Sequence, residues 1–153
     1  MDVEKWDRRF LAHAEFVSQW SRDPSTKVGA VITREKVIVS SGYNGFPRSM
    51  PDRVESYVNR DEKLSRIIHG EVNALIFSQQ SVEGCTLTTF PFSPCDRCSV
   101  ILLQAGIKRF VFPALPADKV ERWGKSMETA KQYITECGAT WTEYQPVVQG
   151  VQG

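Results

Sequence analysis

The spacing of apolar residues predicts four helices along the chain. Residues 3–20 carry apolar side chains at intervals of three and four, which is typical of a helix with one face on a core. The members of this stripe are Val3, Trp6, Phe10, Ala14 and Val17, extended by Trp20. Polar capping residues at Ser65, Ser93 and Asp118 predict the starts of three more helices, and Gly106 and Gly138 predict the ends of the last two.

Runs of β-branched and aromatic residues between these helices predict five strands. The first two flank Arg34-Glu35-Lys36, which suits a tight hairpin, and the segments are 28–33, 37–41, 85–89, 108–112 and 139–144. This order predicts an α/β protein with a three-layer α/β/α fold and a five-stranded mixed sheet, in which strands joined through helices run parallel. Residues 46–64 show little periodicity and indicate a long loop that is functional or mobile.

Size and charge limit the partners of the chain. A length of 153 residues fits a single domain at residues 1–144, followed by a C-terminal tail at 145–153. The net charge is +1 without a basic run, so we expect no nucleic-acid partner. The N-terminal stretch is charged and no apolar run approaches 18 residues. We therefore expect no signal peptide, no membrane span and a cytoplasmic location, which the four cysteines also fit.

Two short motifs carry the candidate chemistry, His69-Gly70-Glu71 and Pro94-Cys95-Asp96-Arg97-Cys98. The two cysteines lie three residues apart at a predicted helix start, where the helix dipole favours the thiolate form that binds metal. With the histidine they offer three ligands to one Zn²⁺, and a set of three leaves the fourth position to water. The glutamate is then the candidate general acid and base.

Neither motif is decisive alone. A C-x-x-C pair also fits a redox pair or half of a structural zinc site. His69 and Glu71 are two residues apart, so their side chains converge only if His69 lies at the very start of a helix. The other candidate ligands, His13, Cys85 and Cys137, do not lie at ligand spacing from the trio.

Two polar segments are candidates for holding a substrate. Residues 21–27 offer the hydroxyls of Ser25 and Thr26 and the cations of Arg22 and Lys27 to an anion such as phosphate, although a solvated connection explains the same composition. Asn44, before Gly45, either serves turn chemistry or lends its side-chain amide to a ligand.

The two motifs, with segments 21–31 and 42–45, resemble the cytidine/deoxycytidylate deaminase superfamily from about residue 7 to about residue 144, with dCMP deaminases the most similar. The resemblance implies zinc on His69, Cys95 and Cys98. It implies that Glu71 moves protons while hydroxide attacks C4 of cytosine and ammonia leaves, which converts dCMP to dUMP. It also places Asn44 at a sugar hydroxyl, the 21–27 loop near the phosphate and Gly70 beside the substrate.

The resemblance implies partners as well. They are a small-molecule nucleotide as substrate, further copies of the chain in a homo-oligomer (a hexamer or a dimer), and dCTP and dTTP as activating and inhibiting effectors.

The chain departs from the dCMP deaminase pattern at several positions. Gly70 stands where alanine is usual, and Phe90-Pro91-Phe92 replaces the usual lead into the cysteine motif. The loop 113–116 has no tyrosine to help hold the nucleotide, and residues 46–64 lack the ligands of a second zinc site. Two alternatives stay open. One is a deaminase of another cytosine nucleoside or a modified cytidylate, and the other is a catalytically silent, zinc-stabilised nucleotide-binding subunit.

Overall fold

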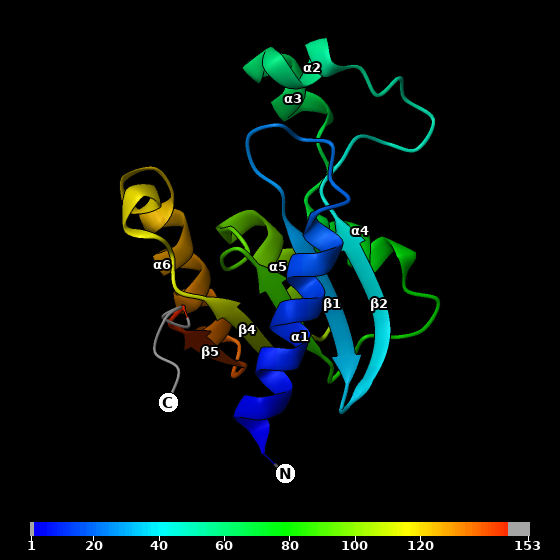
Figure 1. The fold of residues 1–153 in the computed structure, drawn as a ribbon. Helices are drawn as coiled ribbons and strands as arrows, with labels where there is room; N and C mark the ends of the chain where they lie inside the picture. The colour runs from blue at the N-terminus through cyan, green and yellow to red at the C-terminus, as the bar shows by residue number, and fades with distance from the viewer. Residues whose placement is uncertain (1, 147–153) are drawn as a thin grey trace, which may run out of the picture.

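A five-stranded mixed sheet forms the centre of the protein in a computed structural model, which describes residues 2–146 (Figure 1). The strand order is β2-β1-β3-β4-β5; β1 runs antiparallel to both neighbours, whereas β3, β4 and β5 run parallel. The strands are β1 Gly29–Arg34, β2 Val37–Tyr43, β3 Thr86–Phe90, β4 Arg109–Pro113 and β5 Thr140–Tyr144. The predicted α/β class and mixed sheet are confirmed. Of the predicted tail, residues 147–153 lie outside the described residues.

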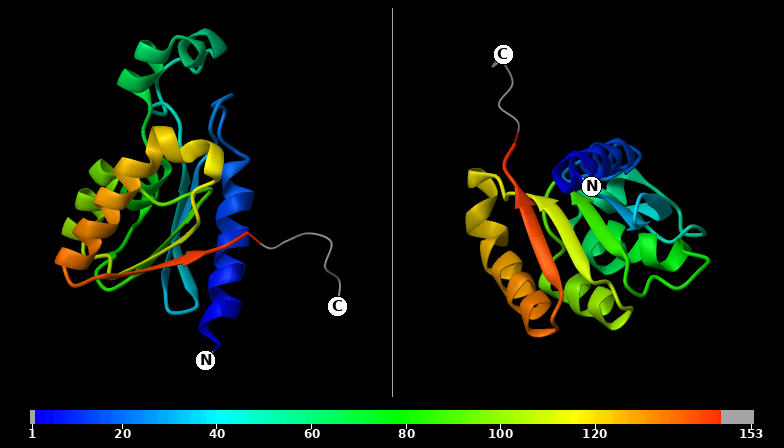
Figure 2. Two further views of the ribbon diagram at one scale, coloured as in Figure 1. Left: turned by 90° about the vertical axis from the view of Figure 1, so that its left-hand side faces the viewer. Right: turned by 90° about the horizontal axis from the view of Figure 1, so that it is seen from below.

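Helices cover both faces of this sheet (Figure 2). One face carries α1 and the other carries α4, α5 and α6, which makes the predicted three layers. The bounds are α1 Val3–Ser18, α4 Gly70–Phe77, α5 Asp96–Gln104 and α6 Val120–Glu136. Within residues 2–146, no helix is long and apolar enough to cross a bilayer.

The central strand β1 contributes to the apolar core on both faces of the sheet. Ala30 and Ile32 pack into the cluster that includes residues of α4, α5 and α6, whereas Val31 packs with Phe10 and Ala14 of α1. This division follows from the alternation of side chains along a strand. The sheet is thereby packed between helices on both of its faces.

Three predicted helix caps are wrong, because each polar candidate is used elsewhere. Ser65 lies inside another helix, where its hydroxyl donates to the Glu62 carbonyl, and α4 is capped by His69. The buried Ser93 hydroxyl donates to Met127 Sδ, and α5 is capped by Cys95. Asp118 lies in a 3-10 turn, η1 Ala117–Lys119, that precedes α6.

The ends of the helices are closer to the predictions. Gly106 and Gly138 follow α5 and α6 with φ of 99° and 73°, a left-handed backbone in which glycine is favoured, so both predicted ends are confirmed. The extension of the first stripe to Trp20 is wrong, because α1 ends at Ser18 and Trp20 is 54% exposed.

The long loop predicted at residues 46–64 contains two short helices, α2 Val54–Val58 and α3 Arg60–Arg66. They lie apart from the sheet, at the top of Figure 1. The Asn59 side chain caps α3 by accepting from the Glu62 amide, 3.1 Å away. No residue of α3 is fully buried. The sequence therefore lacks the apolar period by which a helix is recognised. We call α2 and α3 with their connection the α2–α3 hairpin.

Candidate active site

Two helix starts bring the motif residues together. His69 is the N-cap of α4 and Cys95 is the N-cap of α5, and both have extended backbones, so their side chains reach past the helix ends. His69 Nδ1 lies 3.1 Å from Cys98 Sγ and 3.6 Å from Cys95 Sγ. Two residues that are two apart within a helix point in nearly opposite directions. His69 precedes the helix, so this restriction does not separate its side chain from that of Glu71.

The three side chains fit a zinc ion. Their ligand atoms all lie within 4.8 Å of one another. A tetrahedral ion with a Zn–N bond of about 2.0 Å and a Zn–S bond of about 2.3 Å separates nitrogen and sulfur by about 3.5 Å, so the observed distances bracket this value. Among the described residues, no fourth His, Cys, Asp or Glu joins the cluster.

Hydrogen bonds join the three side chains of this cluster, and a bound metal ion would take the place of the shared protons. A hydrogen bond from Cys98 lowers the pKa of Cys95, and the same bond, with burial, raises the pKa of Cys98. A hydrogen bond with Cys95 raises the pKa of His69. Metal binding requires both thiolates and the neutral imidazole, so a bound cation would displace these protons.

Glu71 lies in the first turn of α4 and is 4% exposed. Burial raises its pKa to about 7, against the opposing positive charge of His69. Its Oε2 atom is buried and has no hydrogen-bond partner among the described residues. A buried, unpartnered carboxylate oxygen is costly and indicates a group whose partner is a ligand.

A cavity opens above these residues and is lined by side chains from the loops at this edge of the sheet, from α3 and from the starts of α4 and α6. We call it the active-site cavity. Its lining residues are Asp23, Ser25, Thr26, Val28, Asn44, Arg60, Lys63, Leu64, Ile67, His69, Gly70, Glu71, Phe92, Ser93, Cys95, Arg122, Trp123 and Met127.

The predicted substrate residues divide into two groups. Ser25, Thr26, Asn44 and Gly70 line the cavity. Arg22 and Lys27 do not line it. Arg22 pairs with Asp52 at 3.5 Å, and the Lys27 ammonium donates to the Ser21 carbonyl. The structure therefore does not bring the two predicted cations to the site.

Asn44 has a structural task in addition to its place in the cavity. Its Oδ1 accepts from the Val28 amide at 2.9 Å, and its Nδ2 donates to the Thr26 carbonyl at 2.9 Å and to Asp23 at 3.4 Å. The side chain thus holds the 21–27 loop in place. One lone pair of Oδ1 remains to accept from a ligand hydroxyl.

The lining residues that sequence reasoning missed include three cations and one tryptophan: Arg60, Lys63, Arg122 and Trp123. Two come from the α2–α3 hairpin and two from the first turn of α6. The available signal was weak. Arg122 follows a predicted helix start, where the dipole disfavours a cation, and this misplaced charge could have been noticed.

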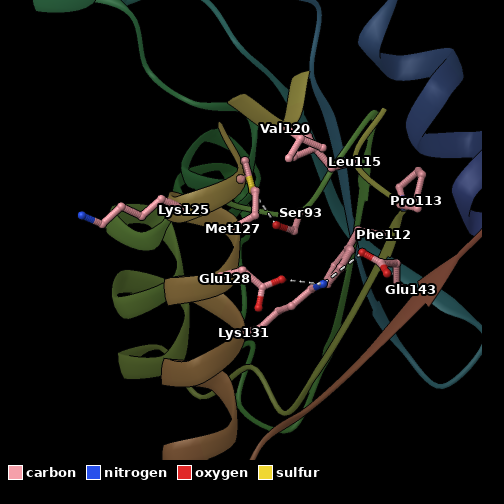
Figure 3. Close-up of a pocket in the computed structure, with 12 residues that line it drawn as sticks. Ser93, Phe112, Pro113, Leu115, Val120, Lys125, Met127, Glu128, Lys131 and Glu143 are labelled. Carbon is pink, nitrogen blue, oxygen red and sulfur yellow. Dashed lines mark hydrogen bonds and ion pairs between the residues drawn. The ribbon is translucent and has the colours of Figure 1, made fainter. Parts of the chain in front are cut away.

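A second cavity of about 400 Å³ adjoins the first, because Ser93 and Met127 line both (Figure 3). Its walls are mainly apolar residues of the β4 end and of α6. Lys131 lies in it between Glu128 at 3.5 Å and Glu143 at 3.1 Å. Two carboxylates neutralise the charge of this lysine. None of the motif residues His69, Glu71, Cys95 and Cys98 lines this second cavity.

Comparisons with known proteins agree with this site. Residues 4–114 match the family model described as the cytidine and deoxycytidylate deaminase zinc-binding region. The chain therefore belongs to the cytidine and deoxycytidylate deaminase family. It is 37% identical to an uncharacterized deaminase of Aliivibrio fischeri, over 91% of this chain and 95% of that one. It is 32% identical to the deoxycytidylate deaminase of Mus musculus, over 95% of this chain and 83% of that one.

Solved structures share the fold. The dCMP deaminase of cyanophage S-TIM5, in complex with dCMP and dUMP, matches with a TM-score of 0.72 and 24% identity over 94% of this chain and 98% of that one. A bifunctional deaminase and reductase from Thermotoga maritima matches with a TM-score of 0.63 and 18% identity, over 91% of this chain and 36% of that one. The family's zinc-binding region and the ligand cluster confirm zinc as the cofactor; the roles of single residues stay predictions.

Proposed function

We propose that the protein is a zinc-dependent hydrolase that deaminates dCMP to dUMP and releases ammonia. One observation carries this conclusion: the buried Glu71 carboxylate, with an unpartnered oxygen, lies beside three zinc-type ligands in an open cavity. The deoxycytidylate deaminases of mouse and human, 32% and 36% identical to this chain, support dCMP as the substrate.

The division of work follows from the geometry. His69, Cys95 and Cys98 would hold zinc, which when bound supplies a water molecule acidic enough to ionise near neutral pH. Glu71, with its pKa near 7, can hold or release a proton at neutral pH. Its free Oε2 would take a proton from the attacking water and deliver it to N3 of cytosine as the water oxygen bonds to C4. The second proton of that water would pass through Glu71 to the amino group, which leaves as ammonia as the C4–N bond breaks and the C4 carbonyl forms. Its burial keeps bulk water from competing for these protons.

Asn44 and the loop it holds would position the sugar. The remaining lone pair of Asn44 Oδ1 can accept from a sugar hydroxyl, and Ser25 and Thr26 line the same cavity. The Trp123 indole, stacked on Phe92 at 6.1 Å, supplies an aromatic wall in place of the tyrosine that the 113–116 loop lacks.

Assembly and regulation belong to the same proposal. Phe16, Trp20 and Tyr43 are 61%, 54% and 40% exposed and meet edge to face, which supports a surface covered in a homo-oligomer, a dimer or hexamer. Sedimentation velocity tests the assembly, and rates with added dCTP and dTTP test the effectors. Four free cysteines support a reducing, cytoplasmic location.

Ammonia release from a panel of substrates tests the proposed function. The zinc-loaded protein should turn over dCMP faster than deoxycytidine, cytidine, cytosine, dAMP or guanine. A clear preference for an unphosphorylated substrate would contradict the nucleotide assignment and favour a nucleoside deaminase. Binding of dCMP without release of ammonia would favour the silent nucleotide-binding subunit.

A further inference from the structure

We infer that Arg60 and Arg122 bind the substrate phosphate and make the enzyme select a nucleotide over a nucleoside. This inference rests on the proposed deamination of dCMP and deepens it. Arg60 begins α3 and Arg122 lies in the first turn of α6, and both line the cavity that holds Glu71. Figure 2 shows that this end of α6 is the one directed towards the α2–α3 hairpin.

Apart from Glu71 at the zinc end, the other charged side chains of the cavity have partners of opposite charge. Lys63 pairs with Asp23 at 2.8 Å, and two thiolates balance a bound Zn²⁺. Within residues 2–146, no ion pair or hydrogen bond is formed by the side chain of Arg60 or Arg122, and the neighbouring acids Asp61 and Glu121 do not line the cavity. Two positive charges therefore remain for a ligand. A phosphate monoester, with a charge of about −1.5 to −2 at pH 7, matches them.

The surroundings of Arg122 favour an oxygen anion. Its guanidinium carbon lies 4.8 Å from the centre of the Trp123 ring, and Trp123 in turn stacks on Phe92. A guanidinium covered on its face keeps its N–H edge for acceptors in its own plane. Phosphate oxygens accept two such bonds in parallel, a geometry that a lysine cannot offer.

The cations predicted from the sequence are committed to other contacts. Arg22 lines a different cavity and pairs with Asp52, and Lys27 donates to the Ser21 carbonyl. The 21–27 loop can still contribute the hydroxyls of Ser25 and Thr26. Its positive charge, however, lies outside the active-site cavity, and the charge inside comes from α3 and α6.

Steady-state kinetics with dCMP and deoxycytidine test this assignment, because the two substrates differ only in the phosphate. Arg60→Gln and Arg122→Gln should each lower kcat/KM for dCMP by about 10- to 100-fold, the effect of losing a hydrogen bond to a charged group. The loss should fall mainly on KM, since the phosphate is remote from the reacting atoms. Deoxycytidine turnover should change less than about threefold. Arg122→Lys should restore only part of the dCMP preference.

A binding measurement and a matched control complete the test. Calorimetric titration with dUMP should show the same weakening, and binding of deoxyuridine should not change. Arg53→Gln removes an exposed arginine of the same segment that lines no part of the cavity, and should leave both substrates unaffected.

The outcomes separate the two proposals. If the wild-type preference for dCMP survives both Arg60→Gln and Arg122→Gln, while Arg22→Gln or Lys27→Gln abolishes it, the phosphate lies at the loop and the inference is overturned. If both substrates lose turnover equally in the arginine variants, the arginines act on structure and the inference also fails. A wild-type protein without any preference for dCMP contradicts the proposed nucleotide function itself.

Discussion

The two ends of the active-site cavity are built in different ways. At the zinc end, three side chains come from two helix starts that pack on the sheet, and their ligand atoms lie within 4.8 Å of one another. At the opposite end, cations come from the α2–α3 hairpin and from α6, and the hairpin is linked to the 21–27 loop by polar contacts such as Lys63 to Asp23. The proposed chemistry therefore lies where helices pack on the sheet, whereas the proposed recognition of the substrate draws in addition on the hairpin, which lies apart from the sheet.

This difference suggests how specificity can change in such a fold. Residues that hold zinc and move protons cannot be displaced without loss of the reaction, because small shifts of catalytic groups are costly. Arg60 and Arg122 are exposed, so we expect that they can be exchanged while the sheet stays intact. The following predictions test this division from the largest effect to the smallest.

Cys98→Ala should have the largest effect, because it removes a buried sulfur of the proposed zinc site. The protein should lose its stoichiometric zinc, measured by atomic absorption, and turnover of dCMP should fall to background. Cys137→Ala removes an exposed cysteine outside the cluster and should leave zinc content and turnover unchanged. Full activity of Cys98→Ala would exclude Cys98 as a ligand.

Glu71→Gln should retain zinc and lower kcat by about 10²- to 10⁴-fold, the usual contribution of a general acid and base. The amide has nearly the shape of the carboxylate but cannot accept and release the proton. Zinc content and circular dichroism should match the wild type, which separates a chemical from a structural loss. Persisting turnover would mean that another group moves the protons.

Asp23→Asn tests the attachment of the hairpin. Burial raises the pKa of Asp23, but the Lys63 ammonium and the amides of Ser25 and Thr26 outweigh it, so the net pKa lies below the ordinary value. The charge therefore stabilises the fold at neutral pH, and this stabilisation is lost as the pH falls through the lowered pKa. At pH 7 the substitution should lower the unfolding free energy by about 1.5–3 kcal/mol.

Urea denaturation at pH 7 and pH 3 measures this difference, which should shrink at pH 3 because the stabilisation by the Asp23 charge begins to be lost once the pH falls below the ordinary carboxyl pKa of 3.8. Asp61→Asn, an exposed carboxylate on the same hairpin, should change the unfolding free energy by less than about 0.5 kcal/mol. An equal loss at both pH values would show that the Asp23 charge does not attach the hairpin.

Gly70→Ala should have the smallest effect. A Cβ atom there would lie 3.1 Å from the Val28 carbonyl oxygen, a tight contact that small shifts relieve, and alanine favours the helix by up to about 1 kcal/mol. We expect unfolding free energy within about 1 kcal/mol of the wild type in thermal melts. Gly42→Ala is the contrast, since its Cβ would lie 2.4 Å from the Ala74 backbone nitrogen, and it should cost about 1–3 kcal/mol.

The same division explains what could be predicted from the sequence. His69, Glu71, Cys95 and Cys98 were found because metal ligands and a proton carrier need particular residue types at short spacings. The sheet was found because its strands are short β-rich runs between periodic helices. Both signals are local in the chain.

The substrate end has no such local signal. Arg60 and Arg122 are 62 positions apart by their residue numbers, and only the packing of α6 and the hairpin brings them to one cavity. In the hairpin, α3 has no fully buried residue and α2 buries only Ser56 and Tyr57, so these short helices leave no apolar period in the sequence. The sequence predicts Arg22 and Lys27 as phosphate ligands because they lie near Ser25 and Thr26 in the chain, but their side chains turn to Asp52 and Ser21.

A crystal structure of the zinc-loaded protein with bound dUMP tests the central claim most directly. The account predicts an anomalous zinc peak between His69 Nδ1 and the sulfurs of Cys95 and Cys98, with the pyrimidine ring beside Glu71 and no fourth protein ligand. A zinc ion closed by a fourth side chain, or bound away from Glu71, would contradict the hydrolytic account.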